Sequence, residues 1–185
     1  MTLTLHESAA RLGAFCWIER RLFEVLGGSL GVLSQPDAKV LVDRHATHAA
    51  WRGQQWWERL PVLAQVDREE LLSPETPGVG ALYGALCPPR SAEEAGSGER
   101  LSPVGFLAGI YRVALPRLGA SYATYRALTS PVSDAPARRT LSQVEADLEV
   151  DRAEGESFVH SLLDCEAAID EAAAAVARLE RLLLV

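Results

Sequence analysis

The sequence predicts an all-α protein built as a four-helix bundle. Three long segments and a fourth, interrupted one repeat their apolar residues with the period of a helix, and no alternating apolar run indicates a strand. The connections within the first pair and within the second pair are short, which predicts two antiparallel hairpins. About forty residues separate the two pairs, enough for a connection that crosses the length of the bundle.

The first helix is predicted over residues 4–26. A seven-residue repeat runs along it, formed by Leu5, Leu12, Glu19 and Leu26. This repeat places the carboxylate of Glu19 in the middle of an apolar seam. The two glycines that follow, Gly27 and Gly28, are a stop signal for the helix.

The second helix is predicted over residues 36–60, because Pro36 suits a first helical turn and the helical period continues until Pro61. Residues 64–101 are predicted to form the long crossover, since prolines interrupt their short apolar pieces. Within this segment, AEEAGSGE has the composition of an exposed, mobile loop.

The third helix is predicted from Ser102, as its cap, to Leu128, with a kink at Pro116. The fourth helical region begins near Ala137 and runs with a break to Leu184, so an extra C-terminal helix is expected. Asp151 lies in the middle of its apolar stripe. A length of 185 residues favours one domain over residues 1–185.

Charge and cysteine content exclude several classes of function. A net charge of −7 argues against a nucleic-acid partner, which would require a basic face. No stretch reaches the roughly 18 apolar residues that a membrane span needs. The three cysteines are odd in number and far apart, and no leader-like segment opens the chain. We therefore expect a cytoplasmic protein without a membrane partner.

The candidate metal ligands are polar residues on or beside the apolar helix faces. A carboxylate that faces a core costs several kcal/mol unless it is paired, protonated or bound to a metal. His45 and His48 are three residues apart, so both could approach one ligand. Asp147 lies one turn before Asp151, a spacing that suits a shared cation or proton. The candidates are Glu19, His45, His48, Asp147 and Asp151.

Each candidate also has a purely structural interpretation. Glu19 could pair with one of the arginines nearby in the sequence or on the second helix, namely Arg20, Arg21, Arg44 and Arg52. Three tyrosines on the third helix, Tyr111, Tyr122 and Tyr125, are candidates to line a pocket, although core packing is the commoner role. A hydrogen-bonded structural network is the favoured interpretation of the carboxylates. No catalytic residue is assigned, because no P-loop, dinucleotide turn or nucleophile elbow is present.

Arranged by helix, these candidates resemble the ferritin-like di-metal carboxylate superfamily, in which two helices each supply a Glu and two supply Glu-x-x-His. Glu19 corresponds to the first carboxylate. The segment from His45 to His48 corresponds to one Glu-x-x-His with histidine in the Glu position, and Leu148 to Asp151 corresponds to the other with both positions altered. Tyr111 falls where the third-helix Glu is expected. The ligand set is therefore incomplete relative to the superfamily.

The resemblance implies a ferritin-like four-helix bundle with an eroded metal centre, acting as a binding or assembly module. Homo-oligomer formation is expected from apolar residues that exceed the needs of one bundle. A first alternative is an oxidoreductase with a single iron or manganese ion bound by Glu19, His48 and Asp151. A second is a metal-free, small-molecule pocket in which Glu19 or Asp151 acts as a general base.

Overall fold

The computed structural model describes residues 3–64, 66–88 and 101–184, and in these ranges the chain is helical without any strand. Its only bridge between extended residues in these ranges joins Leu63 and Val66. The helices are α1 (Leu5–Ser29), α2 (Pro36–Arg59), α3 (Pro77–Leu86), α4 (Pro103–Gly109), α5 (Leu115–Leu128), α6 (Ala135–Leu162) and α7 (Glu166–Leu182). Two short helical segments lie between these helices. The segment η1 (Arg68–Leu71) is a 3-10 helix, and η3 (Ile110–Ala114) is a π-helical turn between α4 and α5. The all-α prediction is confirmed.

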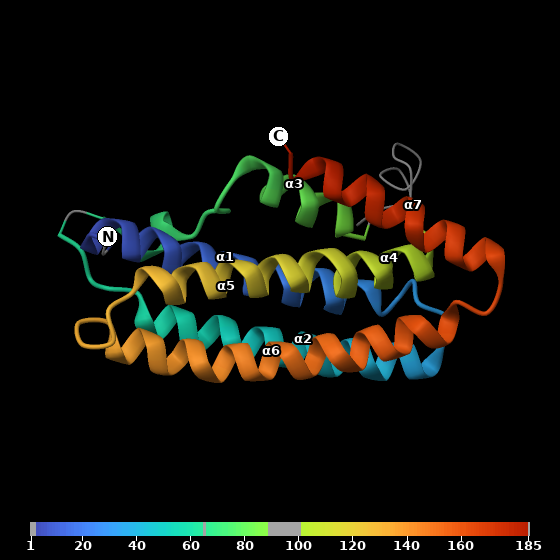
Figure 1. The fold of residues 1–185 in the computed structure, drawn as a ribbon, viewed down its shortest axis with the longest axis horizontal. Coiled ribbons are helices and arrows are strands. Elements are labelled where there is room, and N and C mark those ends of the chain that lie inside the picture. Colours follow the sequence, from blue (N-terminus) through green and yellow to red (C-terminus); the bar gives the residue numbers. More distant parts are fainter. Residues whose placement is uncertain (1–2, 65, 89–100, 185) are drawn as a thin grey trace.

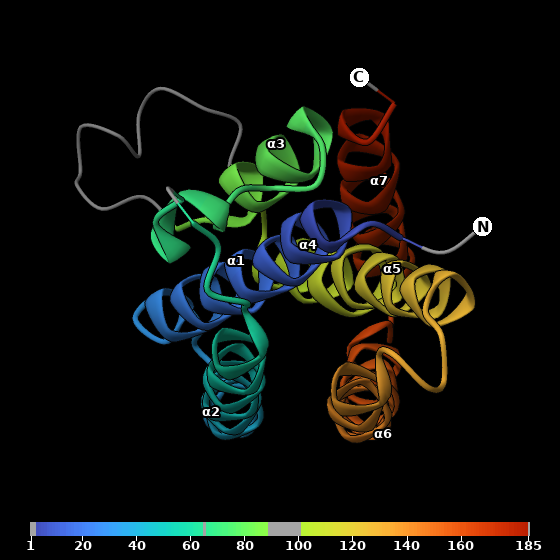
Figure 2. The ribbon, with the colours of Figure 1, turned by 90° about the vertical axis from the view of Figure 1, so that its left-hand side faces the viewer.

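The helices lie in three layers (Figures 1 and 2). One outer layer contains α2 and α6, the middle layer contains α1 and the continuous α4–η3–α5 rod, and α3 and α7 form the other outer layer. Figure 1 shows α1 antiparallel to α2, and α5 antiparallel to α6. It also shows that α2 ends and α4 begins at opposite ends of the molecule. The segment between them, with η1 and α3, therefore spans the length of the bundle.

The α1 helix is capped as its sequence allows but ends later than predicted. Thr4 and Glu7 form a reciprocal capping box at its start. The helix continues through Gly27 and Gly28, so the predicted stop was wrong. A glycine ends a helix when it adopts a left-handed conformation, whereas here Leu30 after the helix is still right-handed, with φ −57° and ψ −30°. A Cβ on Gly28 would lie 3.0 Å from Pro88, so this glycine serves packing.

The third predicted helix exists, and its irregularity lies just before Pro116. Ser102 caps α4 by accepting a hydrogen bond from the Gly105 amide at 3.0 Å, as predicted. The π-turn η3 then precedes α5, and the Leu115 amide bonds to the Ile110 carbonyl. Proline lacks an amide proton and its ring clashes with the carbonyl four residues earlier. A π-turn at this point accommodates that clash while the rod remains continuous.

The outer α3 and α7 layer was only partly predicted. The break before α7 and the extra C-terminal helix are confirmed, whereas α3 was missed inside the crossover. Thr76 caps α3 and Pro77 occupies its first turn. The helix has only ten residues, and three of them are glycines, so its sequence shows little helical periodicity. The predicted mobile loop AEEAGSGE lies outside the described residues.

Packing of this layer uses much of the apolar sequence that suggested self-association. Val79, Leu82, Tyr83 and Leu86 of α3 are buried, as is Leu179 of α7. Homo-oligomer formation stays a prediction. No helix in the described ranges is both long and apolar enough to cross a bilayer.

Candidate functional site

The two carboxylates predicted in the helix seams are both buried, and one arginine links them. Glu19 on α1 and Asp151 on α6 are 0% and 1% exposed, and Arg52 on α2 is also 0% exposed. Arg52 donates from Nε to Glu19 Oε1 at 2.8 Å and from Nη1 to Asp151 Oδ2 at 2.7 Å. The same Nη1 donates to Asp147 Oδ2 at 2.9 Å. Three carboxylates therefore share one guanidinium.

The helices α1 and α2 pack closely at Gly53, beside Arg52. A Cβ on Gly53 would lie 3.4 Å from the Cβ of Glu19, at the short limit of ordinary van der Waals contact. The close approach lets the short Glu19 side chain reach the Arg52 guanidinium.

On the inner side, Glu19 belongs to a hydrogen-bonded chain that continues through Tyr122 of α5 to Trp56 of α2. Tyr122 of α5 donates to Glu19 Oε1 at 2.7 Å, and Trp56 Nε1 donates to the Tyr122 hydroxyl at 2.9 Å. Burial raises the pKa of Glu19, and the charge of Arg52 with the two hydrogen bonds offsets part of that rise. The Glu19 Oε2 and Arg52 Nη2 atoms are buried and without a hydrogen-bond partner among the described residues.

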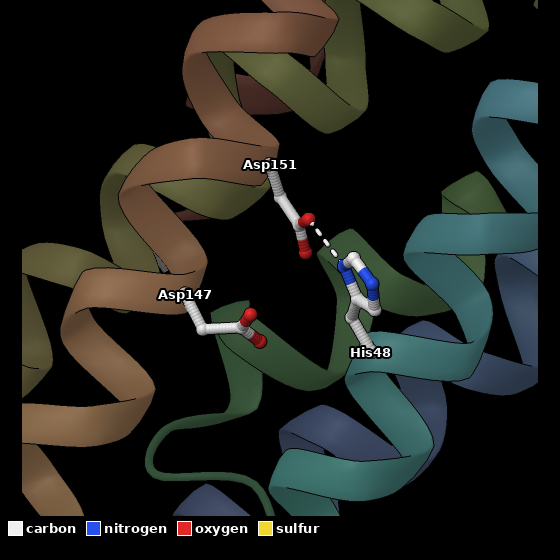
Figure 3. A group of neighbouring side chains, drawn as sticks. All are labelled: His48, Asp147 and Asp151. Carbon is white, nitrogen blue, oxygen red and sulfur yellow. Dashed lines mark hydrogen bonds and ion pairs between the residues drawn. The ribbon is translucent and has the colours of Figure 1, made fainter.

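On the outer side, Asp151 faces two histidines of α2. Its Oδ1 lies 2.7 Å from His48 Nδ1 and 3.5 Å from His45 Nε2. Figure 3 shows the His48 ring from α2 pointing at Asp151 of α6, with Asp147 beside them. His48 and Asp147 are 34% and 30% exposed, whereas Asp151 is buried. This group lies on the seam between α2 and α6, at its opening to solvent.

The geometry around His45 defines the proton positions on its ring. Its Nε2 lies 3.2 Å from Glu154 Oε2 and its Nδ1 lies 2.8 Å from the Tyr111 hydroxyl. Burial lowers the pKa of His45, and the nearby carboxylate of Asp151 acts in the opposite direction. An ionised carboxylate only accepts, so neutral His45 carries its proton on Nε2 and accepts from Tyr111.

The three candidate pocket tyrosines fill the core and each binds a protein group. Tyr111 reaches His45, Tyr122 reaches Glu19, and the Tyr125 hydroxyl lies 3.0 Å from Ser8 Oγ. All three rings are buried, and those of Tyr122 and Tyr125 meet Phe15 edge to face. In this arrangement their hydroxyls satisfy buried polar atoms.

Three of the five candidate metal ligands lie close enough together to share one ion. One ligating atom from each of His48, Asp147 and Asp151 lies within 4.8 Å of the others. Glu19 is not in this group, because Arg52 lies between Glu19 and Asp151. One imidazole and two carboxylates are suitable ligands for manganese, iron or zinc.

Sequence reasoning did not identify the central role of Arg52, which it named only as one of four candidate partners. Its spacing contained a signal, because Arg52 follows His48 by four residues and His45 by seven, which places all three on one helix face. Glu154 was also missed. It lies three residues after Asp151 and binds both His45 and Arg44.

Comparison with known proteins leaves the site to be interpreted on its own geometry. No protein-family model, no curated protein and no solved structure matches this chain.

Proposed function

We propose that this protein is a ferritin-like helical bundle that binds one divalent transition-metal ion on the seam between α2 and α6. The ligands are His48, Asp147 and Asp151. The observation that carries the proposal is the convergence of three ligating atoms within 4.8 Å at a partly exposed position.

The arrangement of helices supports the ferritin-like part of the proposal. Two antiparallel hairpins, α1–α2 and the α4–α5 rod with α6, are joined by a segment that spans the bundle. One long crossover between two such hairpins is the ferritin-like connection. The site also lies between helices of different hairpins, where bundle proteins build their metal centres.

The local charge supports a divalent ion. Three carboxylates, those of Glu19, Asp147 and Asp151, surround the single positive charge of Arg52. With His45 and His48 neutral, the net charge of these four side chains is −1 when Glu19 is protonated and −2 when Glu19 is ionised. A divalent cation balances this excess, and the half-buried position strengthens the attraction relative to bulk water.

The partial exposure of His48 and Asp147 has a chemical consequence. Three protein ligands leave at least one position of the ion open to water or to a small ligand, as in catalytic rather than structural sites. A solvent-facing ion of this kind exchanges with the medium.

The experiment is equilibrium dialysis and calorimetric titration of the chelator-treated protein with Mn²⁺, Fe²⁺ under anaerobic conditions, and Zn²⁺. We expect one ion per chain. His48→Ala and Asp147→Asn should each weaken binding by about tenfold or more.

Two matched variants serve as controls. His160→Ala removes an exposed histidine of α6, and Asp43→Asn removes an exposed aspartate of α2. Neither should change the affinity. The proposal fails if the wild-type protein binds none of these ions, or if the control variants weaken binding as much as the site variants do.

A further inference from the structure

We propose that Arg52 is an internal counter-cation that limits the α2–α6 site to one ion, its guanidinium occupying a place where the surrounding side chains would otherwise hold a second cation. This inference deepens the proposed function and rests on it for the first ion. It assigns Arg52 as the residue that determines the number of ions bound.

The first argument is the identity of the groups around the guanidinium. Its three hydrogen bonds run to Glu19, Asp147 and Asp151 at 2.7 to 2.9 Å. Each of these groups is a carboxylate from α1 or α6, and carboxylates are metal ligands. Two histidines contact the other carboxylate oxygen of Asp151, with His48 Nδ1 at 2.7 Å and His45 Nε2 at 3.5 Å from Oδ1.

The second argument is that the guanidinium satisfies this shell incompletely. Arg52 Nη2 and Glu19 Oε2 are fully buried and make no hydrogen bond with any described residue. In a bidentate pair, the guanidinium donates two parallel hydrogen bonds to the two carboxylate oxygens. Here Arg52 donates only one hydrogen bond to Glu19, from Nε to Oε1. A buried carboxylate oxygen without a donor is costly, and a divalent ion coordinated by Glu19 would satisfy it.

The third argument is competition for shared ligands. Arg52 Nη1 binds the same carboxylates, Asp147 and Asp151, that belong to the group with His48. A cation bound by that group must share both carboxylates with a fixed positive charge. Removal of the guanidinium therefore releases Asp147, Asp151 and Glu19 together and also removes a repulsive charge.

The test compares wild type, Arg52→Gln and Arg52→Lys. Glutamine removes the charge while keeping an amide that can donate to a carboxylate, and lysine keeps the charge. Dialysis against Mn²⁺ or Zn²⁺ followed by elemental analysis gives the number of ions per chain. We expect Arg52→Gln to bind a second ion, whereas Arg52→Lys retains the wild-type stoichiometry.

Thermal unfolding is the second readout. Arg52→Gln should melt below wild type in chelator, because three carboxylates lose their cation, and Mn²⁺ or Zn²⁺ should raise its melting temperature more than that of wild type. If Arg52→Gln is unfolded in chelator, recovery of helical circular dichroism on addition of either ion supports the proposal, and failure to recover it at millimolar ion overturns it.

The outcomes for the two proposals are distinguishable. If wild type binds one ion and a folded Arg52→Gln also binds only one, the role of Arg52 is overturned while the proposed function stands. If wild type binds none, the proposed function fails, and the limit of one ion set by Arg52 fails with it.

Discussion

The Glu19 side chain acts mainly through a single oxygen. Oε1 accepts from both Arg52 Nε and the Tyr122 hydroxyl, whereas Oε2 has no partner among the described residues. The hydrogen-bonding role of Glu19 therefore depends on an acceptor in one position and does not require a carboxylate.

We predict that Glu19→Gln destabilises the protein less than Glu19→Leu, because the amide oxygen can still accept both hydrogen bonds although the charge opposite Arg52 is lost. Glu19→Leu should lose more, since it leaves two buried donors unpaired at about 1–3 kcal/mol each. The measurement is the free energy of unfolding in urea at pH 7 with chelator present. Equal losses in the two variants would contradict the assigned hydrogen bonds.

The three cysteines differ in environment, and this leads to a prediction of pH-dependent reactivity. Burial raises the pKa of Cys16 from 9.0 to about 11, whereas Cys165 is exposed. The thiolate is the reactive form, and a raised pKa means that the buried thiol stays protonated at pH 8 to 9. Iodoacetamide followed by mass spectrometry should modify Cys165 readily and leave Cys16 intact. Labelling of Cys16 at the rate of Cys165 in the folded protein would be incompatible with this burial.

At the scale of secondary-structure elements, the π-turn η3 and helix α6 meet at Gly155. A Cβ at this glycine would lie 2.0 to 2.4 Å from atoms of the Tyr111 ring. Tyr111 is on the π-turn and its hydroxyl reaches His45. The glycine therefore lets α6 approach η3 closely enough for this hydrogen bond to form.

We predict that Gly155→Ala destabilises the protein by about 1–3 kcal/mol, as overpacking of a core does. Gly27→Ala is the matched control, because a Cβ there would meet nothing within 4 Å, and alanine favours a helix by up to about 1 kcal/mol over glycine. Thermal or urea unfolding of both variants measures the difference. A neutral Gly155→Ala would mean that η3 and α6 are farther apart than described.

At the scale of the whole molecule, the outer layer of α3 and α7 shares one apolar core with the bundle. Ala175 of α7 would lie 3.0 Å from a Cβ on Gly105, and Leu179 and Leu86 would meet one on Gly109. This close packing of α7 and α3 on the α4–η3 rod indicates cooperative unfolding of one domain.

The tryptophans allow this to be measured, because all four lie on α1 and α2. We predict that tryptophan fluorescence and far-ultraviolet circular dichroism report the same midpoint in urea. The fluorescence comes from side chains of the first hairpin, of which Trp17 also packs against Tyr83 of α3, whereas circular dichroism reports every helix. Different midpoints for the two signals would show that part of the molecule unfolds separately, against the single-domain prediction.

The sequence by itself determined the all-α class, the extents of α2 and of the α4–α5 rod, and the burial of Glu19 and Asp151. These follow from local rules, because helical periodicity, Ser102 as a cap and proline in a first turn act over a few residues. The end of α1 did not follow, since Gly28 packs against Pro88, which is distant in sequence. The existence of α3 did not follow either, since its ten residues include three glycines and carry little helical periodicity.

Only the tertiary structure decided how the polar residues are partnered. Four arginines were candidates for Glu19, and the close contact of α1 with α2 at Gly53 selects Arg52. Asp147 belongs to the group with His48, whereas Glu19 does not. The reason is the register between α2 and α6, which places Arg52 between Glu19 and Asp151 in the core. Such a register is set by the packing of whole helices, so the spacing of residues along one helix does not contain it.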